Sequence, residues 1–289
     1  MKPLPFIPLI VLLCTAQVSA SAAPPSPLKD IPFAEINGQT LALDLYLPAT
    51  PPKGVIIWVH GGAWRAGSRA KPGLQGMTAH GWAVASVDYR LSGTAPFPAQ
   101  AHDIKAAIRY LRAHAPTLGI PAQPFVVSGS SAGGHLAAIV GVTNHSLPHE
   151  GTIGKNLDQD SSIQAIVDLF GASNLTTILA QSTPHGLSVR QPALDLFIGG
   201  QPDEVPDVAR LASPVFHVDR ADPPLYLSHG DQDPQMPINQ AHELHGVYEA
   251  HELPVRFVVK HGSAHGGPAF TDAAELTRID AFLTAHLAR

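Results

Sequence analysis

Cysteine is almost absent from this 289-residue chain. The one cysteine, Cys14, lies in an N-terminal segment that we expect to be removed from the mature protein. A mature chain without a thiol has no disulfide, no cysteine nucleophile and no metal site built from cysteine. Any nucleophile must therefore be another type of residue.

Charged residues are also scarce, at 14% of the sequence. Lysine and arginine number 18 against 23 aspartates and glutamates, which gives a formal net charge of -5 at pH 7. Such a chain offers no basic face to nucleic acid and no electrostatic reason to bind an anionic membrane. We expect neither a nucleic-acid partner nor a stable membrane association. The hydrophobic content of 45% suffices for a sizeable core and excludes a disordered chain.

The N-terminal apolar run is too short to span a membrane comfortably. Lys2 precedes this run, which ends at Leu13, and small residues follow as far as Ala20. That order is typical of a secretory signal peptide. We interpret residues 1–22 as a signal peptide and residues 23–289 as one folded domain, with a membrane anchor as the alternative. The first interpretation predicts a secreted or periplasmic protein.

Apolar segments of strand length recur along the chain and alternate with longer amphipathic stretches. Asn37-Gly38 separates the first two segments and predicts a hairpin turn. Helical periodicity is clear over residues 98–113 and near the C-terminus. The predicted strands cover residues 31–36, 40–47, 54–59, 82–87, 125–128, 163–170, 225–228 and 255–259. This alternation predicts an α/β fold with a mostly parallel central sheet flanked by helices.

Residues 172–213 interrupt this alternation. Their short apolar groups are separated by four prolines, at positions 184, 192, 202 and 206. We interpret the segment as a small cap insertion of short helices over the strand ends. An ordinary irregular crossover is the alternative, because long inserted segments are not always functional.

A Gly-x-Ser-x-Gly sequence follows the predicted strand 125–128, and an Ala- and Leu-rich segment comes next. This order of strand, tight turn and helix is typical of a nucleophile elbow, which holds a serine at the head of a helix. Gly129 and Gly133 lie two residues on either side of Ser131, where a side chain would collide with the strand–helix crossing. Ser131 is therefore the candidate nucleophile.

Ser131 needs a base, because a serine hydroxyl is a weak nucleophile until its proton is accepted. Asp233 and His265 follow the last two predicted strands. The carboxyl ends of parallel strands meet at one edge of a sheet, so the three side chains are expected to meet there. We predict a catalytic triad of Ser131, His265 and Asp233, with Asp231 as the competing carboxylate.

The sequence His60-Gly61-Gly62-Ala63 follows another predicted strand. An anionic tetrahedral intermediate needs hydrogen-bond donors that already point at it. Glycines let the backbone approach a substrate closely, and an amide at the start of a helix faces the same place. We predict an oxyanion hole built from Gly61, Gly62, Ala63 and Ala132. His60 is expected to be a structural loop residue.

Other histidines carry less information. His242 and His245 are three residues apart, which differs from the four-residue spacing of helical zinc ligands. A solvated helix face is the better interpretation of this pair. We expect no metal and no cofactor.

Six blocks of the sequence resemble those of α/β-hydrolase esterases of the acetyl-xylan/feruloyl esterase-like and hormone-sensitive-lipase-like kinds. The blocks cover residues 60–64, 88–90, 97–100, 129–134, 229–234 and 264–266. The resemblance implies an α/β-hydrolase fold and places the catalytic aspartate on Asp233 rather than Asp231. Ala63-Trp64 stands where the lipase pattern has a third glycine, which favours the polysaccharide-esterase branch.

The resemblance implies a serine esterase and suggests acetyl or feruloyl esters of plant polysaccharides as substrates. We expect short-acyl carboxylic esters, because the cap interrupted by four prolines offers little apolar surface. We also expect the bulky side chain of Trp64 to stand beside the oxyanion hole and to crowd a long acyl chain. Two alternatives remain: a peptidase of the prolyl-oligopeptidase kind, and a non-catalytic binding protein of the same fold.

Overall fold

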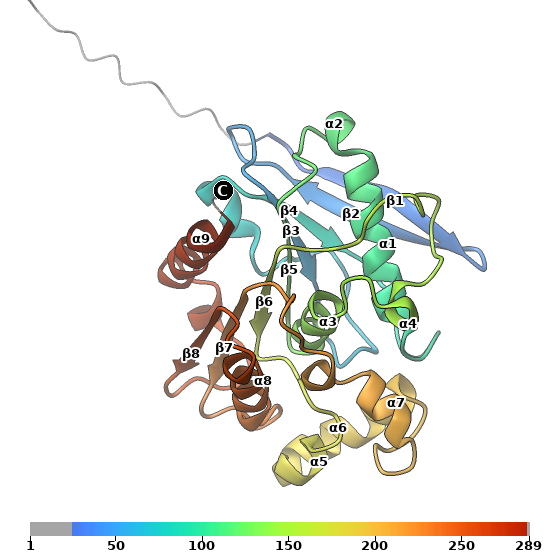
Figure 1. Cartoon of the computed structure of the whole chain (residues 1–289), viewed down its shortest axis with the longest axis vertical. Helices are drawn as coiled ribbons and strands as arrows, with labels where there is room; N and C mark the ends of the chain where they lie inside the picture. The colour runs from blue at the N-terminus through green and yellow to red at the C-terminus, as the bar shows by residue number, and fades with distance from the viewer. Residues whose placement is uncertain (1–24, 288–289) are drawn as a thin grey trace, which may run out of the picture.

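The computed structural model describes residues 25–287, which form a twisted eight-stranded sheet between two layers of helices (Figure 1). Residues 1–22, interpreted as a signal peptide, and Cys14 lie outside this described part. The strand order is β1-β2-β4-β3-β5-β6-β7-β8. The strands are β1 (Leu28–Ile36), β2 (Gln39–Tyr46), β3 (Val55–Val59), β4 (Ala83–Val87), β5 (Phe125–Ser130), β6 (Ala165–Leu169), β7 (Leu225–Gly230) and β8 (Val255–Lys260).

Strands β3 to β8 are parallel, whereas β1 and β2 form an antiparallel hairpin that joins the sheet along β4. Asn37 and Gly38 make the two-residue turn of this hairpin, with φ angles of 52° and 78°, which confirms the predicted turn. β1 begins at Leu28, before the predicted start. Pro32 is tolerated within it because β1 is an edge strand with two register shifts.

The central strands β3, β4 and β6 are buried on both faces, which explains their unbroken apolar sequences. Val55, Ile57 and Val59 of β3 pack into one apolar core, and Ile56 and Trp58 pack into the other. One helical layer contains α1 (Ala99–Ala113), α3 (Ala132–Gly141) and α8 (Asn239–Ala250), and the other contains η1 (Gln75–His80) and α9 (Ala273–Leu287). The predicted α/β fold is confirmed.

Shorter helices complete the chain: α2 (Ala115–Leu118), α4 (Leu147–Glu150) and η3 (Pro268–Phe270). Within residues 25–287, no helix has both the length and the apolar character needed to cross a membrane.

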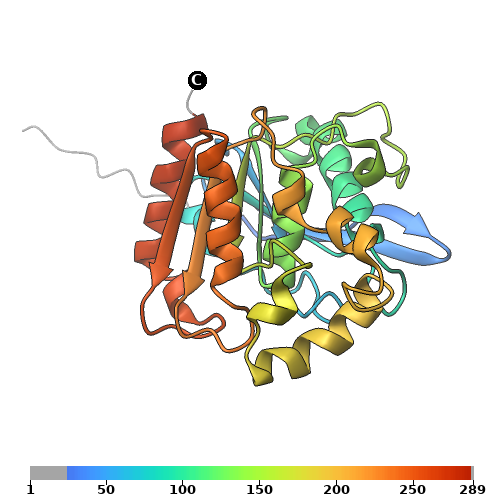
Figure 2. The same cartoon turned by 60° about the horizontal axis from the view of Figure 1, so that its bottom comes forward.

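The segment between β6 and β7 lies across the carboxyl ends of the strands (Figure 2). It contains α5 (Ile178–Gln181), α6 (Pro184–Phe197), α7 (Pro206–Leu211) and η2 (Pro214–Phe216), and we refer to these elements as the cap. α6 continues through Pro192, where we expected an interruption. Pro192 and Ser188 both lie on the exposed side, so the carbonyl that loses its N–H donor can bind water instead.

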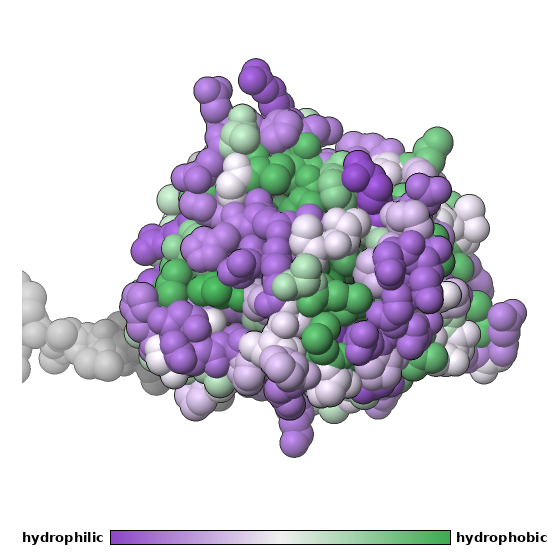
Figure 3. Space-filling view, turned by 90° about the horizontal axis from the view of Figure 1, so that it is seen from below, coloured by the Kyte–Doolittle hydropathy of each residue, from purple (hydrophilic) through white to green (hydrophobic). Residues whose placement is uncertain are grey.

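Figure 3 shows the face of the molecule that carries the cap and the carboxyl ends of the strands. Its apolar side chains form several separate patches among hydrophilic ones. This face therefore presents no single broad apolar surface.

Candidate active site

Ser131 lies in the tight turn between β5 and α3, with φ 55° and ψ -120°. A β-carbon on Gly129 would lie 2.2 Å from the carbonyl oxygen of Gly133, and one on Gly133 would lie 2.1 Å from that of Val59. Neither position can hold a side chain, so both glycines are required by the close approach of β3, β5 and α3. The backbone N–H of Ser131 donates to the carbonyl oxygen of Leu169 at 2.9 Å. The backbone thus fixes where the serine hydroxyl stands.

The structure brings Ser131, His265 and Asp233 into one hydrogen-bonded chain. His265 Nε2 is 2.7 Å from Ser131 Oγ, and His265 Nδ1 is 2.6 Å from Asp233 Oδ2. The other carboxylate oxygen of Asp233 accepts hydrogen bonds from the amides of Gln235 and Met236, at 2.9 and 2.8 Å. These contacts leave Nδ1 of the histidine as the protonated nitrogen and Nε2 as the acceptor that faces the serine.

Asp233 stays ionised although its side chain is fully buried. Burial alone would raise the pKa of Asp233, but N–H donors from His229, His265 and Met236 outweigh it and hold that pKa far below its usual range. His229 Nε2 is 2.9 Å from the carbonyl oxygen of Met236 and 3.4 Å from Asp233 Oδ2. The carboxylate therefore carries a negative charge behind His265 near neutral pH.

Asp231, the competing carboxylate, faces away from this chain. It accepts hydrogen bonds from His261 Nδ1 at 2.8 Å and from the amide of Gly262 at 2.7 Å, on the exposed side of the loop. His261 and Gly262, rather than His265, are its partners. The geometry thus places Asp233 behind the histidine.

The turn after β3, residues 60–66, packs directly against the elbow, and we refer to it as the oxyanion turn because the oxyanion hole is predicted there. A β-carbon on Gly61 would lie 2.8 Å from the carbonyl oxygen of Ser130 and 3.5 Å from Ser131 Cβ. Gly62 has a φ of 117°, and its carbonyl oxygen accepts hydrogen bonds from the backbone amides of Arg65 and Ala66, which close the turn. Gly61 therefore lies beside Ser131, Gly62 and Ala63 follow it in the same turn, and Ala132 follows Ser131 at the start of α3.

His60 lies at the base of this turn and is buried. Its Nδ1 donates to the carbonyl oxygen of Gly61 at 2.8 Å, and its ring stacks on Tyr89 with 4.3 Å between centroids. Burial lowers the pKa of His60, which keeps the ring neutral. The expectation of a structural loop residue is confirmed. His242 and His245 both contact the ring of Phe257.

The side chain of Trp64 does not stand beside the predicted oxyanion hole. Its side chain is fully buried and stacks on Phe197 of α6, with 4.4 Å between ring centroids and 11° between ring planes. Ala63 and Trp64 both have positive φ, 51° and 60°, and this left-handed turn directs the indole into the core. The prediction that Trp64 crowds a long acyl chain is wrong, because the ring is not in the open site.

Arg190 of α6 is a neighbour of the site that the sequence did not reveal. It is 1% exposed, donates from Nη2 to the carbonyl oxygen of Gln235 at 3.1 Å, and lies 5.7 Å from the Trp64 ring. Burial lowers the pKa of Arg190 to about 10, although the charge of Asp233 acts in the opposite direction. The only signal in the sequence was one arginine on the apolar face of a helix.

A cavity of about 350 Å³ adjoins the site, because Ser130 and Gly267 are part of its lining. Trp58, Phe170 and Phe270 contribute aromatic rings to its wall. Its volume lies at the lower end of the range for small-molecule pockets.

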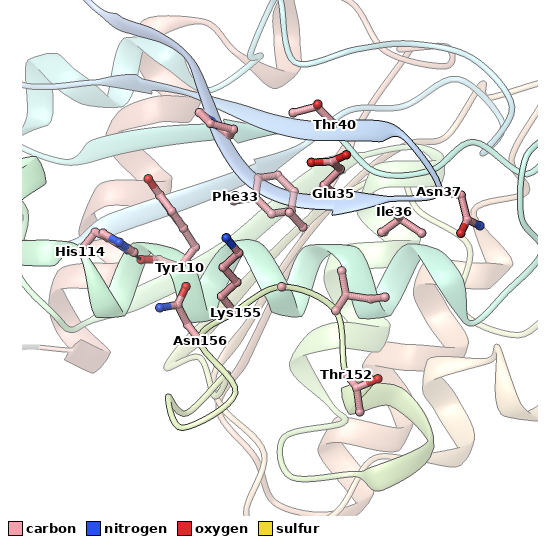
Figure 4. A pocket seen from close by; sticks show the side chains of 14 residues that line it. Phe33, Glu35, Ile36, Asn37, Thr40, Tyr110, His114, Thr152, Lys155 and Asn156 are labelled. Carbon is pink, nitrogen blue, oxygen red and sulfur yellow. Dashed lines mark hydrogen bonds between the residues drawn. The ribbon is translucent and has the colours of Figure 1, made fainter.

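Another cavity, of about 810 Å³, lies between the β1–β2 hairpin, α1 and residues 152–156 (Figure 4). Tyr110 and Lys155 are among its lining residues. None of the predicted site residues lines either cavity. The smaller cavity is lined by Ser130, which precedes Ser131, and by Phe170, whose ring centroid lies 5.0 Å from that of His265. We therefore associate the reaction with the smaller cavity.

Within residues 25–287, no three His, Cys, Asp or Glu side chains form a group that could hold a metal ion.

Comparison with known proteins identifies the family of this chain. A family model described as BD-FAE matches residues 43–248, a range that includes Ser131 and Asp233. Esterase LipC of Mycobacterium tuberculosis is 34% identical over 195 residues, which cover 66% of this chain and 47% of LipC. The chain spans about half the length of the curated relatives that it matches.

Two solved structures share the architecture over most of the described chain. One is a truncated form of a carbohydrate esterase from gut microbiota, with a TM-score of 0.84 and 30% identity, covering 93% of this chain and 99% of that one. The other is a bifunctional GH43-CE protein of Bacteroides eggerthii, with a TM-score of 0.78 and 29% identity, covering 90% of this chain and 35% of that one. The fold is the α/β-hydrolase fold.

Proposed function

Because the chain belongs to the BD-FAE family, we propose that it is a serine carboxylic-ester hydrolase with Ser131 as nucleophile, His265 as base and Asp233 as the supporting carboxylate. The observation that carries this proposal is the unbroken hydrogen-bonded chain from Asp233 through His265 to Ser131 Oγ. A serine at a nucleophile elbow with both partners in contact has the arrangement that acyl transfer requires.

The mechanism follows from the geometry. Ser131 Oγ attacks the ester carbonyl while His265 Nε2 accepts its proton, and Asp233 stabilises the imidazolium that forms. The oxyanion lies near the amides of Gly62, Ala63 and Ala132, and each such donor is worth about 3 kcal/mol of barrier. His265 then protonates the leaving alcohol. A water molecule, activated by the same histidine, releases the acid from the acyl-enzyme.

We propose short-acyl esters of carbohydrates as substrates, including acetyl or feruloyl esters of plant polysaccharides. The carbohydrate esterase among the similar structures supports the carbohydrate part. A short acyl group is supported by the 350 Å³ cavity and by the small, separate apolar patches on the face that carries the cap (Figure 3). A long lipid chain needs a larger apolar surface.

We further propose that the protein is secreted or periplasmic, on the evidence of residues 1–22. Intact-mass measurement on protein from the culture medium or periplasm should give a mature N-terminus near Ser21 or Ala23. A full-length chain retained in the membrane fraction would instead support the anchor interpretation.

A panel of substrates tests the reaction. The panel is a p-nitrophenyl ester series from acetate to palmitate, acetylated xylan, methyl ferulate and a prolyl peptide. We expect rates to peak between acetate and butyrate, with acetate or ferulate released from the natural esters. A peak at ten carbons or longer would contradict the short-acyl proposal. Cleavage of the prolyl peptide in preference to the esters would indicate the peptidase alternative. A folded protein that turns over none of these substrates would indicate the binding alternative.

A further inference from the structure

His135 connects three parts of the molecule that surround the proposed site. It lies in α3, and its backbone N–H donates to the carbonyl oxygen of Ser131 at 3.0 Å. Its side chain is fully buried. Nδ1 accepts the indole N–H of Trp64 at 3.1 Å, and Nε2 donates to the carbonyl oxygen of Ala212, just after α7, at 2.7 Å. One imidazole thus joins the elbow helix, the oxyanion turn and the cap.

These two bonds determine the tautomer of His135. The indole nitrogen of Trp64 only donates, and the carbonyl oxygen of Ala212 only accepts. His135 must therefore be neutral, with its proton on Nε2. Both ring nitrogens are fully used by contacts inside the protein. Burial lowers the pKa of His135 to about 4, which agrees with a ring that stays neutral near physiological pH.

The oxyanion turn depends on such an anchor because its backbone is strained. Ala63 and Trp64 both adopt the left-handed conformation, which costs about 1–2 kcal/mol for each residue with a side chain. Conformations of this kind persist only where the surroundings determine them. The surroundings here are the bond from Trp64 to His135, the stacking of Trp64 on Phe197, and the bond from the amide of Ser92 to the Trp64 carbonyl oxygen, at 2.8 Å.

We propose that His135 is a positioning residue for the oxyanion hole, which holds the Gly62–Ala63 amides in place through the Trp64 side chain and links their position to docking of the cap. The proposal rests on the proposed ester hydrolysis. His135 touches no substrate, so its effect is on the placement of donors that act on the transition state. Such an effect lowers kcat and leaves KM nearly unchanged.

Three substitutions separate the parts of this role. His135→Leu removes both side-chain bonds. His135→Gln keeps an oxygen that can accept from Trp64 and an amide that can donate to Ala212. Trp64→Phe removes the indole donor and keeps an aromatic ring against Phe197.

His149→Leu is the matched control. His149 is also buried and donates from Nε2 to the cap, at the carbonyl oxygen of Leu211, at 3.0 Å. Its Nδ1 bonds to Ser146 Oγ rather than to the oxyanion turn. It therefore anchors the same end of α7 and has no bond to Trp64.

The kinetic test measures kcat and KM for p-nitrophenyl acetate, with the concentration of active sites titrated by a fluorophosphonate. Loss of one oxyanion donor lowers kcat by about 10²–10³, and a displaced donor should lower it by about 10–100-fold. We expect that fall in kcat for His135→Leu and Trp64→Phe, no further fall in the double variant, and recovery in His135→Gln. His149→Leu should keep kcat within about twofold while its melting temperature falls.

A second readout does not require turnover. The indole N–H resonance of Trp64, identified by its loss in Trp64→Phe, should shift in His135→Leu and stay in place in His149→Leu. If the wild-type protein turned over no ester, the proposed function would be refuted. The indole resonance would still test the contact between His135 and Trp64. Each of three results would overturn the positioning role. These are an unchanged kcat in folded His135→Leu, an equal loss of kcat in His135→Leu and His149→Leu, and an indole resonance that does not shift in His135→Leu.

Discussion

His265 is held by hydrogen bonds at both ring nitrogens, and each bond has a separate consequence. The bond to Asp233 fixes the proton on Nδ1, and the bond to Ser131 aims Nε2 at the hydroxyl. Two backbone amides hold the other oxygen of the carboxylate, so Asp233 itself has little freedom to rotate. The order of the proton transfers in the proposed mechanism rests on this rigid arrangement.

Asp233→Asn should lower kcat by several orders of magnitude, about 10⁴ as in the serine protease triad, because an amide can donate to Nδ1 and so favour the wrong tautomer. Asp231→Asn should cost much less, since Asp231 faces His261 instead. Steady-state kinetics on p-nitrophenyl acetate at neutral pH compares the two variants. The opposite ranking would transfer the role to Asp231.

Chain order and the ends of parallel strands predicted where these side chains meet, whereas the choice of Asp233 over Asp231 came from the family resemblance. Ser131, Asp233 and His265 each follow a strand, and parallel strands bring their carboxyl ends together. The orientation of Trp64 could not be predicted in the same way. It depends on two successive left-handed residues, and an alanine followed by a tryptophan gives no sign of that conformation.

At the scale of elements, α6 connects the cap to two parts of the proposed site. Phe197 stacks on Trp64 of the oxyanion turn, and Arg190 donates to Gln235 in the loop that carries Asp233. Arg190 Nε is buried without a hydrogen-bond partner among the described residues. A buried guanidinium with an unsatisfied nitrogen costs free energy. We therefore infer that the charge of Arg190 does not stabilise the folded state.

Arg190→Met tests that interpretation, because methionine keeps an unbranched apolar stem and removes the charge. We expect the free energy of unfolding to change by less than about 1 kcal/mol, or to rise. Arg190→Ala should lose about 2 kcal/mol or more, because it also removes the packed stem. Urea titration of both variants measures the difference. Equal losses in the two variants would mean that the charge itself is stabilising.

The contacts of α6 were beyond prediction for a physical reason. Helical spacing of residues 186, 190, 193, 194 and 197 identifies a buried face. It does not say which distant segments cover that face. Arg190 meets residues about 45 and 126 positions away in the chain, and only the folded topology brings such segments together. The strands are different, because their apolar runs alone identify them.

At the scale of the whole molecule, buried histidines make stability depend on pH. Burial lowers the pKa of His149 to about 4, although its bond to the Leu211 carbonyl oxygen acts in the opposite direction. In the unfolded chain a histidine has a pKa of about 6.5. Between these values the unfolded state binds a proton that the folded state does not, so stability falls as the pH falls.

The measurement compares wild type with His149→Gln at several pH values between 7 and 4. As the pH drops through this window, the stability of the wild type relative to the variant should fall by about 1.4 kcal/mol per pH unit. The comparison is needed because burial raises the pKa of Asp168 and Asp222 to about 7, which acts in the opposite direction over the same window. A difference that does not depend on pH would contradict a neutral buried His149.

A covalent adduct located on Ser131 would identify this residue as the nucleophile of an ester hydrolase. The protein is treated with a fluorophosphonate and digested, and the modified residue is identified by peptide mass spectrometry. We expect one adduct, on Ser131, formed in parallel with the loss of ester turnover, and no adduct in folded Ser131→Ala. An adduct on another residue, or full ester turnover by Ser131→Ala, would contradict it.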